Sequence, residues 1–383
     1  MKEKLLHFGS YVLVALLATV ATLTMVHLEI GLKPSKLDQL EMLIEERFIE
    51  EADAVHLEDA AAEAMVKATA DRWSYYIPAS EYEAYLEQSE NAYVGIGVTI
   101  QAAEDGSGFL ILEVVPGGPA QEAGIQVKDL LIRVEDTDVR SMTVSEVRNL
   151  VKGKEGTSVS LTVLRQGTHQ TLFVDRRKVQ TPVASYEMLD DQIGLVTIEN
   201  FDERCAKESI AAIEALLEDG AKGLIFDVRH NPGGYASELV ELLDYLLPEG
   251  DLFRTVRYDG KEHVDRSDAK CLEIPMAVLV NASSYSAAEF FAAALMEYEA
   301  AVVVGEQTIG KGYFQTTYQL SDGSAVALSI GKYFTPKGVS LAEAGITPDV
   351  VVNVDEETAA EIYYGTLEPE KDPQIQAAVK ALR

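Results

Sequence analysis

The leading candidate for a nucleophile in this sequence is a serine at the start of an alanine-rich segment. Ser286 follows the apolar run Met276–Val280, and Glu289 lies three residues beyond it. This S-x-x-E spacing fits a capping box, in which the hydroxyl and the carboxylate bind free N–H groups at a helix start. The same position would place the hydroxyl beside free N–H groups, such as that of Ala287, that suit an oxyanion. On the residues alone, both interpretations stay open.

A second turn has the same strand-to-helix architecture. The apolar run Gly223–Val228 leads into Arg229–Gly234, which reads RHNPGG. Glycines allow the backbone to approach a ligand closely and to present its N–H groups. Sites in open α/β sheets form at the carboxyl ends of strands, so Gly233 or Gly234 is a candidate oxyanion donor. A purely structural tight turn is the alternative.

A lysine between two glycines is the candidate base. Lys311 has Tyr313 and Phe314 nearby in the sequence, so it is either a solvated surface charge or a buried amine. To act as a base it must be neutral, and its pKa must then fall by about 3 units from its usual value near 10.4. Gln315 could aim the amine. On an ideal strand, residues four apart are separated by about 13 Å, so contact requires a bend, which Gly312 could supply.

The N-terminus contains a candidate membrane anchor. Phe8–Val26 is a run of nineteen residues without charge, and Lys2 and Lys4 precede it. As a helix the run would span roughly 28 Å, close to the thickness of a bilayer core. The lysines place the N-terminus in the cytoplasm and the rest of the chain outside it. A cleaved signal peptide and a buried core helix are the alternatives.

Composition and residue pattern divide the remaining chain into three parts. Residues 33–90 are acidic, rich in alanine and helical in period, which suits packing on another domain or on a second copy in a homo-oligomer. Residues 91–180 show glycine turns and short strands, the first of them predicted at Val94–Gln101. In residues 181–383 predicted strands, such as Ile193–Ile198 and Met276–Val280, alternate with helices, which indicates an α/β structure with a partly parallel sheet. Residues 1–32 form the cytoplasmic tip and the anchor.

Composition excludes several classes of function. The 383 residues include 63 acidic and 32 basic side chains, a net charge of −31, so nucleic acid is not an expected partner. Six histidines and two cysteines form no metal-binding spacing, and we expect no metal and no cofactor. The redox state of Cys205 and Cys271 stays open.

Together these motifs resemble those of the carboxy-terminal processing peptidases, a family of tail-specific serine proteases. Asp227–Gly234 resembles the family motif D-L-R-x-N-P-G-G, and Ser284–Glu289 resembles S-A-S-A-S-E, in which the middle serine is the nucleophile. Gly345–Asp349 resembles the closing G-I-x-P-D. Tyr285 and Ala288 depart from the pattern, which concerns the shape of the pocket more than the chemistry.

The resemblance also implies a catalytic set and a core fold. Lys311 stands 25 residues beyond Ser286, and Gln315 four beyond that, which is the family's Ser/Lys/Gln spacing. The implied core is similar to the crotonase-like fold of the family.

The β-rich module resembles a PDZ domain. Tyr93–Val98, Pro116–Ala120 and Ala123–Ile125 resemble the carboxylate-binding loop, the turn and the short helix of protease PDZ modules. The resemblance implies that the backbone of Gly95, Ile96 and Gly97 captures the C-terminus of a peptide, which adds to the sheet as a strand.

The residue patterns predict an α/β core, an N-terminal helical segment and a transmembrane anchor, and the resemblance implies that the core is a crotonase-like Ser-Lys protease with an inserted PDZ domain. Its expected activity is endoproteolysis of flexible C-terminal tails outside the cytoplasmic membrane. A non-catalytic PDZ scaffold that binds protein C-termini is the rival hypothesis. Crotonase-like acyl chemistry without a covalent serine is a more distant one.

Overall fold

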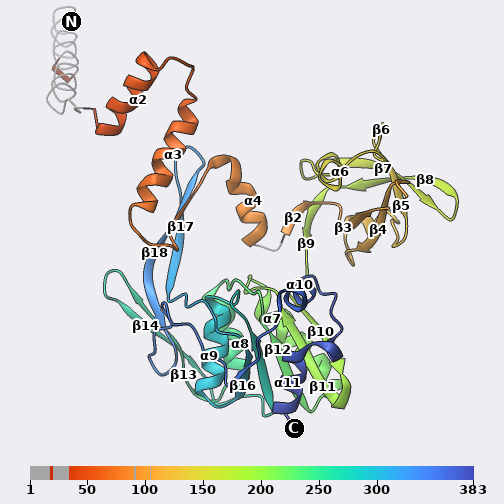
Figure 1. The fold of residues 1–383 in the computed structure, drawn as a ribbon, viewed down its shortest axis with the longest axis vertical. Helices are drawn as coiled ribbons and strands as arrows, with labels where there is room; N and C mark the ends of the chain where they lie inside the picture. Colours follow the sequence, from red (N-terminus) through yellow and green to blue (C-terminus); the bar gives the residue numbers. More distant parts are fainter. Residues whose placement is uncertain (1–17, 20–33, 90–91, 104) are drawn as a thin grey trace, which may run out of the picture. The chain divides into compact units, whose positions relative to one another are not determined.

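A computed structural model describes residues 18–19, 34–89, 92–103 and 105–383 (Figure 1). These residues divide into two compact units, Met1–Tyr76 and Ile77–Arg383. Apart from residues 18–19, the predicted anchor at Phe8–Val26 lies outside the described residues. Among the helices that the structure does describe, none has the length and apolar character needed to cross a bilayer.

The first unit contains two helices, α2 (Lys36–Arg47) and α3 (Ala54–Lys67). The Ser35 side chain accepts a hydrogen bond from the N–H of Asp38, whose carboxylate binds the Ser35 N–H, which is a complete capping box. Neither α2 nor α3 contains a buried residue. A three-residue strand, β1 (Tyr75–Ile77), falls at the junction of the two units.

The second unit begins with helix α4 (Ala79–Ser89) and continues into the β-rich module. The elements of this module are β2 (Ala92–Gly95), β3 (Val98–Ala102), β4 (Phe109–Val114), α5 (Pro119–Glu122), β5 (Leu130–Val134), β6 (Thr137–Asp138), α6 (Val144–Val151), β7 (Ser158–Arg165), β8 (Thr168–Asp175) and β9 (Arg177–Gln180). Its main sheet has the order β3-β4-β5-β7-β8, so β3 is an edge strand, and β2 pairs separately with β9.

The predicted single strand Val94–Gln101 is interrupted, and this part of the prediction was wrong. Gly97 has a φ of +76°, a backbone conformation that ends a strand and that favours glycine. The carbonyl of Ile96 accepts a hydrogen bond from Ala120 instead of from a neighbouring strand. The break separates β2 from β3 and turns the chain at the predicted carboxylate-binding loop.

The α/β core is built on a second six-stranded sheet, of order β10-β11-β12-β15-β16-β19. Within this sheet, β11, β12, β15, β16 and β19 are parallel, and β10 runs antiparallel to β11. Their bounds are β10 (Ala184–Leu189), β11 (Ile193–Ile198), β12 (Gly223–Asp227), β15 (Met276–Val280), β16 (Ala301–Gly305) and β19 (Val350–Val351). The predicted strands at Ile193–Ile198 and Met276–Val280 have these same bounds.

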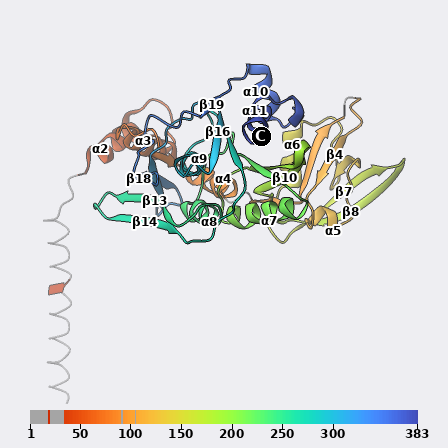
Figure 2. The same ribbon diagram turned by 90° about the horizontal axis from the view of Figure 1, so that it is seen from below.

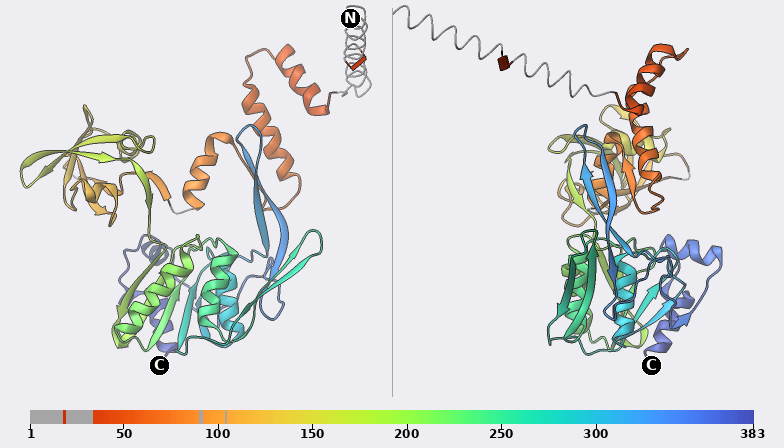
Figure 3. Two further views of the ribbon diagram at one scale, coloured as in Figure 1. Left: turned by 180° about the vertical axis from the view of Figure 1, so that it is seen from behind. Right: turned by 90° about the vertical axis from the view of Figure 1, so that its left-hand side faces the viewer.

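Helices cover both faces of this sheet. Helices α7 (Cys205–Glu218), α8 (Ala236–Leu246) and α9 (Ala287–Glu297) pack on one face through a large buried cluster that includes Phe226 and Phe291. Helix α11 (Pro373–Ala381) packs on the other face through Ile375 and Ala378 (Figures 2 and 3). This three-layer arrangement places the carboxyl ends of β12 and β15 directly before α8 and α9.

The core also contains an antiparallel sheet that the sequence did not predict. It contains β13 (Gly250–Arg257), β14 (Glu262–Ser267), β17 (Tyr313–Gln319) and β18 (Ala325–Phe334). Strand β18 pairs with both β13 and β17. Polar and charged residues interrupt the apolar pattern of these strands, so the period is weak. The remaining elements are the short 3₁₀ helices η1 (Asp190–Gln192) and η2 (Pro369–Lys371), and helix α10 (Glu356–Tyr363).

Candidate active site

Ser286 occupies a strained turn between β15 and α9. Its φ and ψ are 59° and −125°, which a non-glycine residue adopts only where its surroundings enforce it. Such strain is typical of strand-to-helix turns that expose a nucleophile. The residue is 8% exposed. Its side chain therefore lies at the N-terminus of α9, as the sequence predicts.

The carboxylate of Glu289 joins the turn of Ser286 to the segment of Lys311. Oε2 accepts hydrogen bonds from the backbone N–H groups of Ser286 (3.2 Å) and Lys311 (2.9 Å). Oε1 accepts from the N–H of Gly310 (2.8 Å) and from the hydroxyl of Thr308. The side chain is fully buried, which raises the pKa of Glu289, and these hydrogen bonds oppose that rise.

The two glycines of the second turn have different surroundings. The N–H of Gly233 donates to Oδ1 of Asn231 (2.8 Å), so it is already engaged within the turn. Within the described part of the chain, the N–H groups of Gly234 and Ala287 have no hydrogen-bond acceptor. Gly234 and Ala287 therefore have N–H groups available to an oxyanion, whereas the N–H of Gly233, the third predicted donor, is engaged within the turn.

Gly233 instead provides a close approach to the nucleophile turn. Its φ is +87°, and a Cβ atom on it would lie 2.7 Å from Cβ of Ser286 and 2.8 Å from the nitrogen of Ala287. Any side chain here would collide with the start of α9. The absence of a side chain therefore allows the two turns to meet.

Hydrogen bonds between backbone and side chains fasten the two turns together. The N–H of Tyr285 donates to the carbonyl of Asn231 (3.1 Å). The hydroxyl of Ser284 donates to the carbonyl of Val228 (2.7 Å), and the N–H of His230 donates to Oδ1 of Asn281 (3.0 Å). The carboxyl ends of β12 and β15 thus form one rigid unit around Ser286.

Lys311 lies close to the nucleophile turn, at a half-buried position two residues before the start of β17. Its Nζ is 5.7 Å from the centroid of the Tyr285 ring, within the range of a cation–π contact. The hydroxyl of Ser286 is hydrogen-bonded to Oη of Tyr333 (2.7 Å), and no hydrogen bond joins it to Lys311 among the described residues. Ser286 and Lys311 are therefore neighbours through Glu289.

Gln315 lies on β17 beside a β-bulge between Phe314 and Gln315. Its side-chain amide donates to the carbonyl of Tyr313 (3.1 Å) and to Oγ of Ser329 (3.0 Å). In the described chain it makes no hydrogen bond to Lys311. The bend that the sequence required is present, but it follows Phe314 rather than Gly312.

Tyr333 on β18 is a site residue that the sequence did not suggest. It is 4% exposed and packs against Phe253, Phe290 and Phe314. Burial raises the pKa of its hydroxyl further above the usual value, so it stays protonated at neutral pH. No spacing rule could have found it, because Tyr333 lies 47 residues beyond Ser286 and reaches the site only through a strand that was not predicted.

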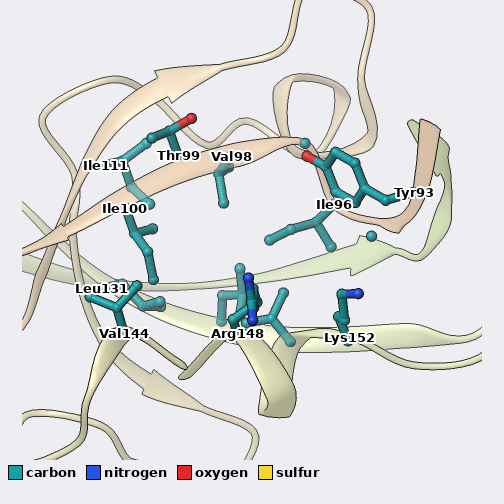
Figure 4. A pocket seen from close by; sticks show the side chains of 14 residues that line it. Tyr93, Ile96, Val98, Thr99, Ile100, Ile111, Leu131, Val144, Arg148 and Lys152 are labelled. Carbon is teal, nitrogen blue, oxygen red and sulfur yellow. The ribbon is translucent and has the colours of Figure 1, made fainter. Parts of the chain in front are cut away.

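A separate groove of about 420 Å³ runs along the edge strand β3 of the β-rich module. Ile96, Val98 and Ile100 point into it from one side, and Val144 and Arg148 of α6 face them from the other (Figure 4). Most of its lining is apolar. An edge strand facing a helix across an apolar groove is suited to binding an extended peptide as an added strand.

The predicted carboxylate-binding loop lies at one end of this groove. The carbonyl of Ile96 accepts from Ala120 and that of Gly97 from Val115, so both carbonyls are engaged within the module. For the residues that the structure describes, the N–H groups of Ile96 and Gly97 have no acceptor. Gly95 also lines the groove, against the ring of Tyr93.

Comparisons with known proteins identify the families to which the two parts of this unit are similar. The profile of Peptidase family S41 matches residues 192–352, and that of the PDZ domain matches residues 87–164. The carboxy-terminal processing protease CtpA of Bacillus subtilis is 34% identical over 322 residues, which cover 82% of this chain and 69% of CtpA. A CtpA-like serine protease of Staphylococcus haemolyticus is 30% identical, with 91% of this chain and 72% of that protein covered.

Among solved structures, that of a Bacteroides fragilis protein assigned to the S41 proteases matches with a TM-score of 0.54. The match covers 89% of this chain and 96% of the other at 17% identity, and it shows a shared fold. Given the extent of the sequence matches, the chain belongs to the carboxy-terminal processing proteases of Peptidase family S41 and is a serine peptidase with a PDZ domain.

Proposed function

We propose that the protein cleaves flexible protein tails with Ser286 as nucleophile and Lys311 as general base. Neutral Lys311 takes the hydroxyl proton of Ser286 as Oγ attacks the scissile carbonyl. The lysine then returns this proton to the leaving amine, and water hydrolyses the acyl-enzyme. Gln315 orients the amine of Lys311 once the substrate is bound.

The N–H groups of Ala287 and Gly234 stabilise the oxyanion that forms in this attack. Both belong to turns at the carboxyl ends of parallel strands, and Ala287 is the first residue of α9. Each donor contributes about 3 kcal/mol to the stabilisation of the transition state. Gly233 supports the hole by its close approach rather than by its N–H.

The observation that carries this proposal is the buried carboxylate of Glu289. A single oxygen binds the backbone of both Ser286 and Lys311. Residues 25 positions apart are thereby fixed on the same side of the helix start. Of the hydrogen bonds that the Glu289 carboxylate makes, a capping box alone would require only the one from the N–H of Ser286.

The substrate tail enters through the PDZ groove in this proposal. Its terminal carboxylate binds the N–H groups of Ile96 and Gly97, and Gly95 leaves room at this end of the groove. The tail extends β3 as an added strand, with apolar side chains in the groove. Binding of the tail shifts the PDZ domain and opens the active site.

We also propose a crotonase-like core and an extracytoplasmic location. The parallel strands β11 to β19 with helices on both faces support the first. The uncharged run Phe8–Val26 and the preceding lysines support a single N-terminal anchor. Residues 1–32, 33–90, 91–180 and 181–383 then correspond to the anchor, the helical segment, the PDZ domain and the protease core.

The test is cleavage of an unfolded protein that ends in apolar residues by the full chain. Ser286→Ala and Lys311→Ala are expected to abolish cleavage. Ser283→Ala and Lys337→Ala are the matched controls, because both side chains are exposed and lie outside the proposed machinery. Both controls should cleave at the wild-type rate.

Cleavage that survives in Ser286→Ala or Lys311→Ala would refute the catalytic pair. A wild-type chain that binds the tail through its PDZ groove and cleaves nothing under these conditions would support the scaffold instead. Removal of residues 91–180 should change the dependence of cleavage on the tail. Unchanged turnover and tail preference would refute the gating role.

A further inference from the structure

The hydroxyl of Ser286 has a hydrogen-bond partner that the proposed mechanism does not use. Its Oγ lies 2.7 Å from Oη of Tyr333. The ring of Tyr333 is fixed by aromatic neighbours, with centroids 4.5 Å from Phe290 and 5.5 Å from Phe253. The contact is therefore a specific pair between a rigid ring and the proposed nucleophile.

The proposed base contacts the residue that precedes Ser286. Nζ of Lys311 lies 5.7 Å from the ring centroid of Tyr285, and the face of an aromatic ring attracts a charged ammonium. Tyr285 stands directly before Ser286, and its N–H is fixed to Asn231. Two tyrosines on different elements thus contact the two members of the proposed pair.

We infer that Tyr333 is a positioning residue that holds Ser286 in a resting rotamer. This inference rests on the proposed function of Ser286 and adds a step before it. The hydroxyl of Ser286 must leave Tyr333 by rotation about χ1 before Lys311 can take its proton. Breaking one hydrogen bond between neutral groups is the barrier that the tail-bound state must overcome.

The inference predicts that removal of the Tyr333 hydroxyl activates the free enzyme. A fluorophosphonate probe reacts with a nucleophilic serine, forming a P–O bond as fluoride leaves, and it needs no PDZ tail. In Tyr333→Phe, the second-order rate constant for labelling of Ser286 should rise roughly 3- to 10-fold, the value of one net hydrogen bond. Wild-type or slower labelling would overturn the inference.

The control is Tyr298→Phe. Its hydroxyl donates to the carbonyl of Asp251 (2.9 Å), remote from Ser286, so the same atom is removed from a part-buried tyrosine. Labelling of this variant should match the wild type. Faster labelling of both variants would indicate general loosening of the fold and would also overturn the inference.

A ratio within each protein removes the influence of partial unfolding. Labelling is measured with and without a peptide that ends in apolar residues, and the ratio does not depend on the fraction of folded protein. Tyr333→Phe should show a smaller acceleration by the peptide than the wild type. An equal or larger acceleration would contradict the proposed role of Tyr333. If the wild-type chain with peptide labels no faster than Ser286→Ala, the proposed function fails before this step is reached.

Discussion

Glu289 is fully buried, and four donors approach its two carboxylate oxygens in pairs. A buried carboxylate is costly unless such donors replace the water that it loses. The nucleophile turn provides one donor, to Oε2. The segment before β17 provides the other three donors, one to Oε2 and two to Oε1. At the residue scale, this side chain determines where Ser286 and Lys311 lie relative to each other.

Glu289→Gln is expected to disrupt both segments. Glutamine keeps one acceptor oxygen but directs an NH₂ donor at two of the four donors, so about two buried donors lose their partners. The free energy of unfolding should fall by about 2–4 kcal/mol, and labelling of Ser286 should slow at least roughly tenfold. Denaturant unfolding and probe labelling measure the two effects.

The control for this change is Glu218→Gln at an exposed position of α7. It removes the same charge, and its unfolding free energy should stay within about 0.5 kcal/mol of the wild type. A Glu289→Gln variant that labels at the wild-type rate would show that the carboxylate does not position the pair.

At the scale of elements, two strand-to-helix turns meet only because glycine occupies position 233. Gly233→Ala introduces both an unfavourable positive φ and a Cβ atom 2.7 Å from Cβ of Ser286. We expect a cost of about 1–2 kcal/mol from the backbone conformation. The clash should in addition reduce cleavage at least roughly tenfold, because it displaces Ser286 and Ala287.

Gly338→Ala separates the two causes. Gly338 has a φ of +79°, and a Cβ atom there would meet nothing within 4 Å. This variant should lose similar stability and retain its cleavage rate. Equal activity in the two variants would contradict the role of the close approach.

The groove between β3 and α6 allows a similar comparison in the PDZ domain. Val144 lines the groove at the first turn of α6, where an acidic side chain suits the helix dipole. Val144→Glu should therefore fold normally but weaken binding of a peptide with an apolar C-terminus by about tenfold. Fluorescence anisotropy with a labelled peptide measures the Kd.

Val127→Glu is the matched control. Val127 is exposed in the same domain, outside the groove, and the substitution changes the net charge equally. Its Kd should equal that of the wild type. Equal weakening in both variants would indicate charge repulsion by the whole domain rather than a groove contact.

The sequence predicts those elements best whose pattern is local. The strands Ile193–Ile198 and Met276–Val280 are short apolar runs with turn residues after them, and both are observed with the predicted bounds. The break at Gly97 and the strands β13 and β18 depend on partners that are distant in the sequence. The periodicity of apolar residues carries no information about such partners. Glu289 was readable only as a cap, since its bonds to Gly310 and Lys311 exist only in the folded chain.

At the scale of the whole molecule, a buried arginine joins the C-terminal helix to the glycine turn. The guanidinium of Arg229 binds the carboxylates of Asp227 and Asp372 and the amide oxygen of Gln374. The side chains of Arg229 and Asp372 are 5% and 4% exposed. Because Arg229 immediately precedes His230 and the turn, α11 contributes to the support of the active site.

Arg229→Met is expected to lower the free energy of unfolding by about 3–5 kcal/mol, because two buried carboxylates lose their partner. Adding Asp372→Asn should cost less than the sum of the two single changes, with a coupling of at least about 0.5 kcal/mol. Denaturant unfolding of the four proteins provides the cycle. Additive effects would show that the pair is not coupled.

Acid-quenched mass spectrometry of the enzyme during turnover of a substrate with an apolar tail tests whether Ser286 is the nucleophile and Lys311 its base. In the wild type, an acyl adduct is expected on the peptide that contains Ser286, and none is expected in Lys311→Ala. Cleavage without an adduct on Ser286, or an adduct that forms equally fast in Lys311→Ala, would refute the catalytic pair.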